Sequence, residues 1–170
     1  MNVVLFGFMG VGKTTVGRLL ASRLSYRFVD SDAETENEMR MKISEAFTLL
    51  GEPEFRAAER RMIERLSLSD EQVIALGGGA VLDPDNVKAL RRTGRMILLT
   101  ASPEEISLRT RGDSSRPLLA GGDKLARIQA LIEERRDRYL AVADMVVDTN
   151  GVPPIRVAEA IHGRLEVVAR

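Results

Sequence analysis

The chain has 170 residues, with 25 basic and 25 acidic side chains and no cysteine. This length suits one domain with a substantial core, so we expect a single domain over residues 1–170. Balanced charge argues against a general nucleic-acid binder, and the lack of cysteine excludes disulfides and thiolate metal sites. No apolar run reaches the length of a membrane span, and a strand begins almost at the first residue, so we expect a cytoplasmic protein without a signal peptide or a membrane partner.

Strands and helices alternate along the chain, which is typical of an α/β fold with a parallel sheet and crossover helices. Short apolar runs predict five strands, at residues 2–6, 26–30, 73–76, 95–100 and 145–148. Amphipathic spacing and end signals predict helices at residues 13–24, 33–40, 43–50, 53–66, 84–94, 103–111, 124–140 and 154–168.

The stretch from Gly7 to Thr14 reads GFMGVGKT and fits the phosphate-binding pattern G-x-x-x-x-G-K-[ST]. It follows a predicted strand and opens a predicted helix, so backbone N–H groups and the helix N-terminus can bind a phosphate. Lys13 is expected to contact the β- and γ-phosphates, and the Thr14 hydroxyl to bind Mg²⁺. The pattern predicts a nucleoside triphosphate site, made by Gly10, Val11, Gly12, Lys13, Thr14 and Thr15.

Two carboxylates, Asp30 and Asp32, follow the second predicted strand, and three glycines at 77–79 follow the third. Because the carboxyl ends of parallel strands meet at one sheet edge, both groups should lie beside the phosphate loop. Asp30 is the candidate magnesium-associated acid. Asp32 is expected to accept or orient the proton of an acceptor hydroxyl, and its alternative role is to cap the next helix.

Two arginines point to an anionic substrate. Arg135 continues an apolar helical row formed by Leu125, Ile128 and Ile132, where a guanidinium needs an anionic partner. Arg56 lies four residues after one glutamate and three before another, so a surface salt-bridge ladder is the alternative to substrate binding. Arginines near a triglycine turn suit a small carboxylate-bearing substrate held by bidentate hydrogen bonds.

Residues 112–123 read GDSSRPLLAGGD and show no helical or strand periodicity. Glycines at both ends predict a mobile lid over the phosphate site, with a passive surface loop as the alternative. Arg116 favours the lid, because phosphoryl transfer needs a cation over the migrating γ-phosphoryl group.

These motifs together resemble the shikimate kinase family, and the resemblance covers essentially the whole chain. It rests on the phosphate loop, Asp30-Ser31-Asp32, GEPEFRAAE at 51–59, the triglycine, RPLL at 116–119, and Arg135 with Tyr139. The family fold is a three-layer P-loop kinase with a five-stranded parallel sheet of order 2-3-1-4-5. Substrate-binding helices at about 32–60 and a lid at about 112–123 are implied with it.

The resemblance implies transfer of the ATP γ-phosphate to the 3-hydroxyl of shikimate, with Mg²⁺ as cofactor. By this analogy Asp32, Lys13 and Arg116 are catalytic, and Thr14 and Asp30 hold the metal. Shikimate is bound by Asp32, Arg56, Arg135 and the backbone of Gly78 and Gly79, and Arg109 lies against adenine. We expect a monomer whose partners are ATP and shikimate, with no nucleic acid or membrane. The alternatives are a related small-metabolite kinase, such as a gluconate kinase, and a nucleotide-binding regulator without turnover.

Overall fold

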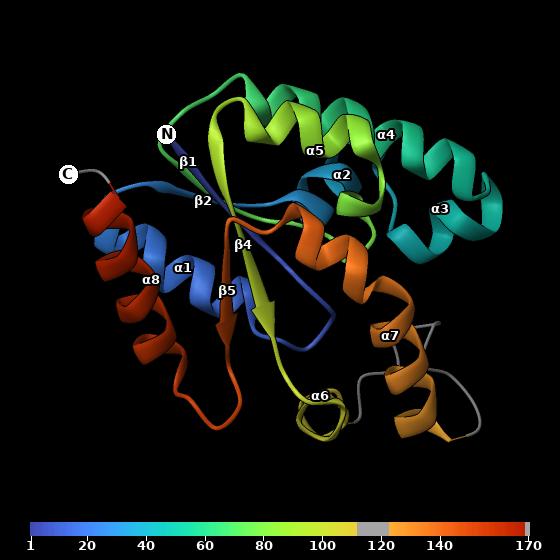
Figure 1. Cartoon of the computed structure of the whole chain (residues 1–170). Coiled ribbons are helices and arrows are strands. Elements are labelled where there is room, and N and C mark those ends of the chain that lie inside the picture. Colours follow the sequence, from blue (N-terminus) through green and yellow to red (C-terminus); the bar gives the residue numbers. More distant parts are fainter. Residues whose placement is uncertain (112–122, 169–170) are drawn as a thin grey trace.

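The computed structural model describes residues 1–111 and 123–168 (Figure 1). The predicted lid at 112–123, with Arg116, therefore lies outside the described residues except for Asp123. None of the helices within the described ranges is long and apolar enough to cross a lipid bilayer.

The described strands form one parallel sheet in the order β2-β3-β1-β4-β5, which confirms the predicted topology. Its central strand, β1, pairs with β3 on one side and β4 on the other, with Leu5 aligned to both Ala75 and Ile97. The bounds of the strands are β1 Asn2–Phe6, β2 Arg27–Asp30, β3 Gln72–Ala75, β4 Gly94–Thr100 and β5 Met145–Asp148.

Helices cover both faces of the sheet, which gives the three expected layers (Figure 1). The helices are α1 Lys13–Leu24, α2 Ser31–Met39, α3 Ile43–Leu49, α4 Glu52–Ser67, α5 Pro84–Arg91, α6 Pro103–Arg109, α7 Lys124–Val142 and α8 Pro154–Val168, with a 3₁₀ turn η1 at Ala80–Leu82. All the predicted helices are present, within a few residues of their expected ends. The 3₁₀ turn was not predicted.

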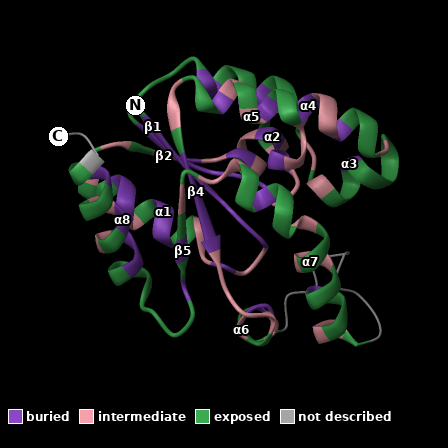
Figure 2. Cartoon of the chain, viewed as in Figure 1, coloured by how far each residue is buried: buried purple, intermediate pink, exposed green. Residues whose placement is uncertain are grey.

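Two apolar cores lie on opposite faces of β1, because successive side chains of a strand alternate between faces. Val3 and Leu5 belong to the core that includes α1 and α8, whereas Val4 and Phe6 belong to the core that includes α4 and α5. Whereas the edge strands β2 and β5 are more exposed, every residue of β1 is buried (Figure 2). This rigid strand ends at the phosphate loop and thereby fixes its position.

Helices α2 and α3 follow β2 in the chain and pack on α4, whose apolar side chains belong to the core on one face of the sheet. In Figure 1, α3 lies at the far end of α4, well away from the strands. Gly51 separates α3 from α4 with a φ of 87°, a backbone conformation that glycine adopts readily. These helices carry the substrate-side residues that the sequence analysis predicted between 32 and 60.

Candidate active site

The loop after β1 has the backbone geometry of a phosphate cradle. Gly7, Gly10 and Gly12 all have positive φ values, of 140°, 80° and 97°. No side chain caps the N-terminus of α1, so its first N–H groups remain available to an anion. The Lys13 ammonium donates to the carbonyl oxygens of Gly7 at 2.9 Å and Phe8 at 3.0 Å, which folds the lysine back over the loop. The structure thus brings the predicted nucleotide-binding residues together.

The side chains of Thr14 and Asp30 meet at the mouth of this loop. The Thr14 hydroxyl donates to Oδ2 of Asp30 at 3.1 Å. Two hard oxygen donors fit Mg²⁺, which usually keeps several waters and takes one or two protein ligands plus phosphate oxygens. No group of three or more acidic, histidine or cysteine residues that could hold a metal occurs in the described part of the chain.

Asp30 also fixes the start of α2. Its Oδ1 accepts hydrogen bonds from the backbone N–H groups of Asp32 at 3.1 Å and Ala33 at 3.3 Å. The helix therefore begins at Ser31, two residues before the predicted start. The alternative role of Asp32 as the helix cap is wrong, because Asp30 caps the helix and the Asp32 side chain lies elsewhere.

The Asp32 carboxylate lies against Gly77, where an added Cβ would overlap its Oδ1. Burial raises the pKa of this carboxyl above its ordinary value, and the neighbouring Asp30 carboxylate raises it further. Lys13 and Arg56 oppose the rise, which places both cations within electrostatic reach of Asp32. A carboxylate that is half buried between two cations is suited to hold a proton from a bound hydroxyl.

Arg56 forms the predicted ladder and also reaches the site. Its guanidinium pairs with Glu52 at 3.3 Å and Glu59 at 2.8 Å. Glu59 is only 2% exposed, and burial raises the pKa of its carboxyl while Arg56 opposes the rise. A Cβ on Gly79 would lie 2.6 Å from Nη2 of Arg56, so the guanidinium packs directly on the triglycine turn. Arg56 can therefore form the salt-bridge ladder and contact the triglycine turn at the same time, because its ion pair with the buried Glu59 leaves the guanidinium against Gly79.

Arg135 approaches the same turn from helix α7. A Cβ on Gly78 would lie 3.7 Å from Nη1 of Arg135 and 3.8 Å from the Tyr139 hydroxyl. The Nε atom of Arg135 is buried and has no hydrogen-bond partner within the described ranges. A buried, unsatisfied guanidinium nitrogen indicates a place for an anionic group.

The triglycine turn is the point where the separate segments converge. Asp32 lies at Gly77, Arg135 at Gly78 and Arg56 at Gly79. The backbone N–H groups of Gly78 and Gly79 have no partner among the described residues. One carboxylate and two guanidinium groups therefore lie against one turn, close to the Gly7 carbonyl oxygen of the phosphate loop, and this set of groups suits a hydroxylated organic acid.

Arg109 joins two segments on the nucleotide side. Its guanidinium donates to the Gly10 carbonyl oxygen at 3.3 Å, to the Thr149 hydroxyl at 3.0 Å and to the Thr149 carbonyl oxygen at 2.8 Å. The side chain thus bridges the phosphate loop and the loop after β5. Arg109 therefore borders the phosphate loop.

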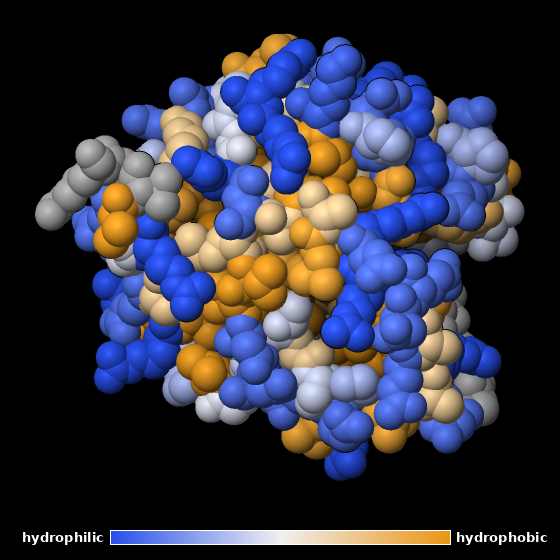
Figure 3. All heavy atoms as spheres, in the orientation of Figure 1, coloured by the Kyte–Doolittle hydropathy of each residue, from blue (hydrophilic) through white to orange (hydrophobic). Residues whose placement is uncertain are grey.

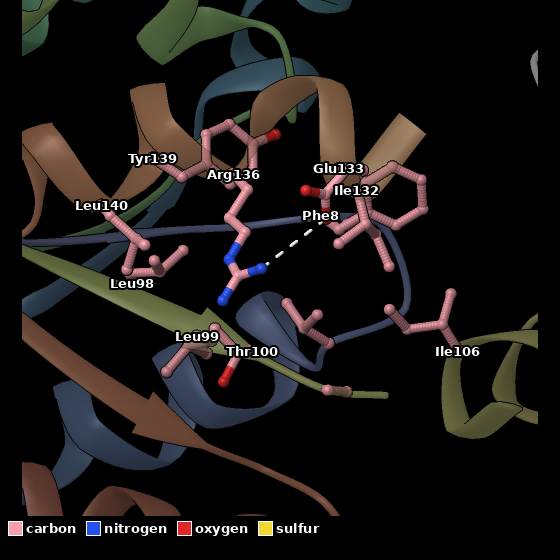
Figure 4. A pocket seen from close by; sticks show the side chains of 12 residues that line it. Phe8, Leu98, Leu99, Thr100, Ile106, Ile132, Glu133, Arg136, Tyr139 and Leu140 are labelled. Atoms are coloured by element: carbon pink, nitrogen blue, oxygen red, sulfur yellow. Dashed lines mark ion pairs between the residues drawn. The ribbon is translucent and has the colours of Figure 1, made fainter. Parts of the chain in front are cut away.

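A cavity of about 330 Å³ lies beside α7, and Tyr139 is one of its lining residues (Figure 4). Its walls are mostly apolar and come from the phosphate loop, from the end of β4 and the residue after it, from α6 and from α7. Arg136 extends across it and pairs with Glu133 at 3.7 Å. Neither Asp32, Arg56 nor Arg135 lines this cavity, so it is distinct from the cluster of charged groups at the triglycine turn. Figure 3 shows apolar residues gathered on the same face of the molecule, between α7 and α8.

Two residues of the site neighbourhood carried no role in the sequence analysis. Glu59 appeared only as a member of the salt-bridge ladder, although its burial distinguishes it from Glu52, whose side chain is 62% exposed. Tyr139 appeared only as part of a motif, although its hydroxyl donates to the Gly78 carbonyl oxygen at 2.5 Å. The apolar row that contains Ile128, Ile132 and Arg135 also contains Tyr139, so its inward orientation was a detectable signal.

Comparisons with known proteins agree with this geometry. A family profile described as "Shikimate kinase" matches residues 9–166. A protein named "Shikimate kinase" from Caldicellulosiruptor saccharolyticus is 46% identical over 160 residues, which cover 94% of this chain and 92% of the relative. One of the same name from Thiobacillus denitrificans is 42% identical and covers 98% and 91%. A solved structure, "Shikimate kinase from Acinetobacter baumannii in complex with shikimate", superimposes with a TM-score of 0.93 at 34% identity, covering 98% of this chain and 93% of that one.

Proposed function

This chain belongs to the shikimate kinase family, and we propose that it transfers the γ-phosphate of ATP to the 3-hydroxyl of shikimate through the site described above. The convergence of Asp32, Arg56 and Arg135 on one triglycine turn supports the proposal most strongly. That space offers cations for a carboxylate and a carboxylate for a hydroxyl, side by side with the phosphate loop.

In the proposed reaction, Arg56, Arg135 and the free amides of Gly78 and Gly79 bind the shikimate carboxylate and orient the ring. The oxygen of the 3-hydroxyl attacks the γ-phosphorus, and the bond from that phosphorus to the β,γ-bridging oxygen breaks. The hydroxyl proton passes to the Asp32 carboxylate, and ADP leaves with the electron pair of the broken bond. Lys13 stabilises the charge on the β- and γ-phosphates, and Arg116 from the lid does so on the transferring group.

Thr14 and Asp30 are the proposed magnesium ligands, Thr14 directly and Asp30 through water. The ion supplies neutralisation of the phosphate charge that develops in the reaction. Gly10, Val11, Gly12 and Thr15 complete the nucleotide site, and Arg109 lies against the adenine. We propose that the enzyme acts as a monomer on small molecules in the cytoplasm.

A coupled assay of ADP release tests the proposal. Shikimate should support turnover that depends on Mg²⁺, and an analogue without the 3-hydroxyl should bind and compete but produce no ADP. The methyl ester of shikimate should bind weakly, because it removes the negative charge that faces the two arginines. Gluconate also carries a carboxylate but is an open-chain acid, so equal turnover with gluconate would show that the site does not select shikimate and would contradict the assignment.

A further inference from the structure

The peptide between Gly78 and Gly79 needs a contact from elsewhere in the fold to fix its orientation. The peptide between Gly78 and Gly79 carries no Cβ on either side, so its rotation about the flanking bonds meets little steric resistance. In a planar trans peptide the carbonyl oxygen and the following N–H point in opposite directions. The direction of the Gly78 carbonyl therefore determines where the Gly79 N–H points.

The Tyr139 hydroxyl holds that carbonyl. It donates to the Gly78 oxygen at 2.5 Å, across 61 positions of sequence. The tyrosine is itself rigid, because it is only 6% exposed and its ring packs edge-on against Phe6 at a centroid distance of 5.8 Å and an interplanar angle of 86°. Phe6 is the last residue of the central strand, so the hydroxyl is anchored to the most buried part of the sheet.

The same tyrosine lies next to the proposed carboxylate-binding arginine. Arg135 precedes it by one helical turn on α7, and both side chains border Gly78. Burial raises the pKa of the Tyr139 hydroxyl and Arg135 opposes the rise, so the hydroxyl stays protonated, as a donor must. Arg135 and Tyr139, one helical turn apart on α7, therefore place the guanidinium and the hydroxyl that binds the Gly78 carbonyl oxygen next to each other at Gly78.

We propose that Tyr139 is a positioning residue that fixes the Gly78–Gly79 peptide, so that the Gly79 N–H and the Arg135 guanidinium are both directed at the substrate carboxylate. The inference rests on the proposed function for the identity of that carboxylate. The link between the tyrosine and the peptide is a property of the chain alone. Tyr139 itself touches no reacting atom in this scheme.

Tyr139→Phe tests the proposal, because it removes the hydroxyl and keeps the ring that packs on Phe6. We expect the KM for shikimate to rise about 10-fold, the cost of one misdirected hydrogen bond to a charged group, with the KM for ATP changed less than about 2-fold. The matched control is Tyr26→Phe at the chain's other tyrosine, which lies at the edge of the core containing α1 and should leave both constants unchanged. A lower melting temperature with an unchanged KM for shikimate would overturn the proposal, since a merely structural tyrosine gives that result.

Nuclear magnetic resonance separates this inference from the proposed function. In ¹⁵N-glycine-labelled protein without ligand, Tyr139→Phe should shift or split the Gly79 amide signal, whatever the substrate is. An unchanged Gly79 signal would overturn the inference, whereas a wild type that binds no shikimate would overturn the proposed function instead. If the phenylalanine variant does not fold, 3-fluorotyrosine in the Tyr26→Phe background labels position 139 alone. Its ¹⁹F signal should respond to shikimate and not to ATP, and the reverse pattern would refute the link.

Discussion

The guanidinium of Arg56 fills the space that a side chain on Gly79 would occupy, with Nη2 2.6 Å and Nη1 2.8 Å from the position of a Cβ. Gly79 itself has a φ of −92°, which any residue can adopt. A glycine is needed at position 79 because the Arg56 guanidinium leaves no room for a side chain, and not because of the backbone conformation.

Gly79→Ala should displace Arg56 without unfolding the protein. We expect the KM for shikimate to rise about 10-fold, because the displaced guanidinium loses its alignment with the substrate, while the KM for ATP stays constant. Gly163→Ala is the control, since its Cβ would meet nothing within 4 Å. That change, in the helix α8, should be neutral or stabilising by up to about 1 kcal/mol. Steady-state kinetics and thermal melts measure both, and a Gly79→Ala enzyme with normal shikimate kinetics would contradict the proposed role of Arg56.

Arg135→Ala should weaken shikimate binding more than turnover. The loss of a charge-assisted contact costs about 1.5–3 kcal/mol, which corresponds to a rise of roughly 10- to 100-fold in the KM for shikimate. Arg136→Ala is a matched control, because Arg136 is the next residue, is exposed, and pairs with Glu133 instead. Calorimetric titration with shikimate distinguishes the two, and similar dissociation constants for both variants would show that Arg135 is structural.

Asp32→Asn should remove the proton acceptor and keep the nucleotide site. General-base removal lowers kcat by about 10²–10⁴-fold, and ATP affinity should remain near that of the wild type. Asp137→Asn, at an exposed position of α7, is the control and should retain full kcat. Near-normal turnover of the Asp32→Asn enzyme would rule out the proposed role of this carboxylate.

The same substitution should stabilise the protein at neutral pH. Burial and the Asp30 carboxylate raise the pKa of Asp32 above 3.8, so the folded state binds its proton more tightly than the unfolded state does. Between the unfolded and the folded pKa the folded state therefore holds more protons, and the stability contributed by this group falls as pH rises. At a pH above the pKa of Asp32 in the folded state, the buried carboxylate is charged and lowers the free energy of unfolding by its full amount.

Asparagine removes that cost, so the melting temperature of Asp32→Asn should exceed that of the wild type at pH 8. At a pH below 3.8 the difference should shrink, because Asp32 is protonated there in both states. Thermal melts of both proteins across this range measure the effect. A melting-temperature difference that stays constant with pH, or a variant less stable than the wild type at pH 8, would show that the charged Asp32 carboxylate does not destabilise the folded protein.

Local sequence patterns determined much of this architecture. The phosphate loop lies between an all-apolar strand and an amphipathic helix, and all three elements form at the predicted positions. The strand order also agrees, although it followed from the family resemblance and not from the residues themselves. Such features depend on periodicity, glycine conformations and end signals within about ten neighbouring residues, which the sequence displays directly.

Only the tertiary structure decided which neighbours hold the side chains of the site in place. The choice between Asp30 and Asp32 as the helix cap depends on where each carboxylate points once β2 has joined the sheet. Two further contacts depend on tertiary packing in the same way. One is the ion pair of Arg56 with the buried Glu59, and the other is the hydrogen bond from Tyr139 to Gly78. In the last case the partners are 61 positions apart in the chain, and no local pattern encodes such a contact. Contacts of this kind form only when the whole core packs together. The sequence therefore identified the reacting groups, whereas the fold determined which residues contact them.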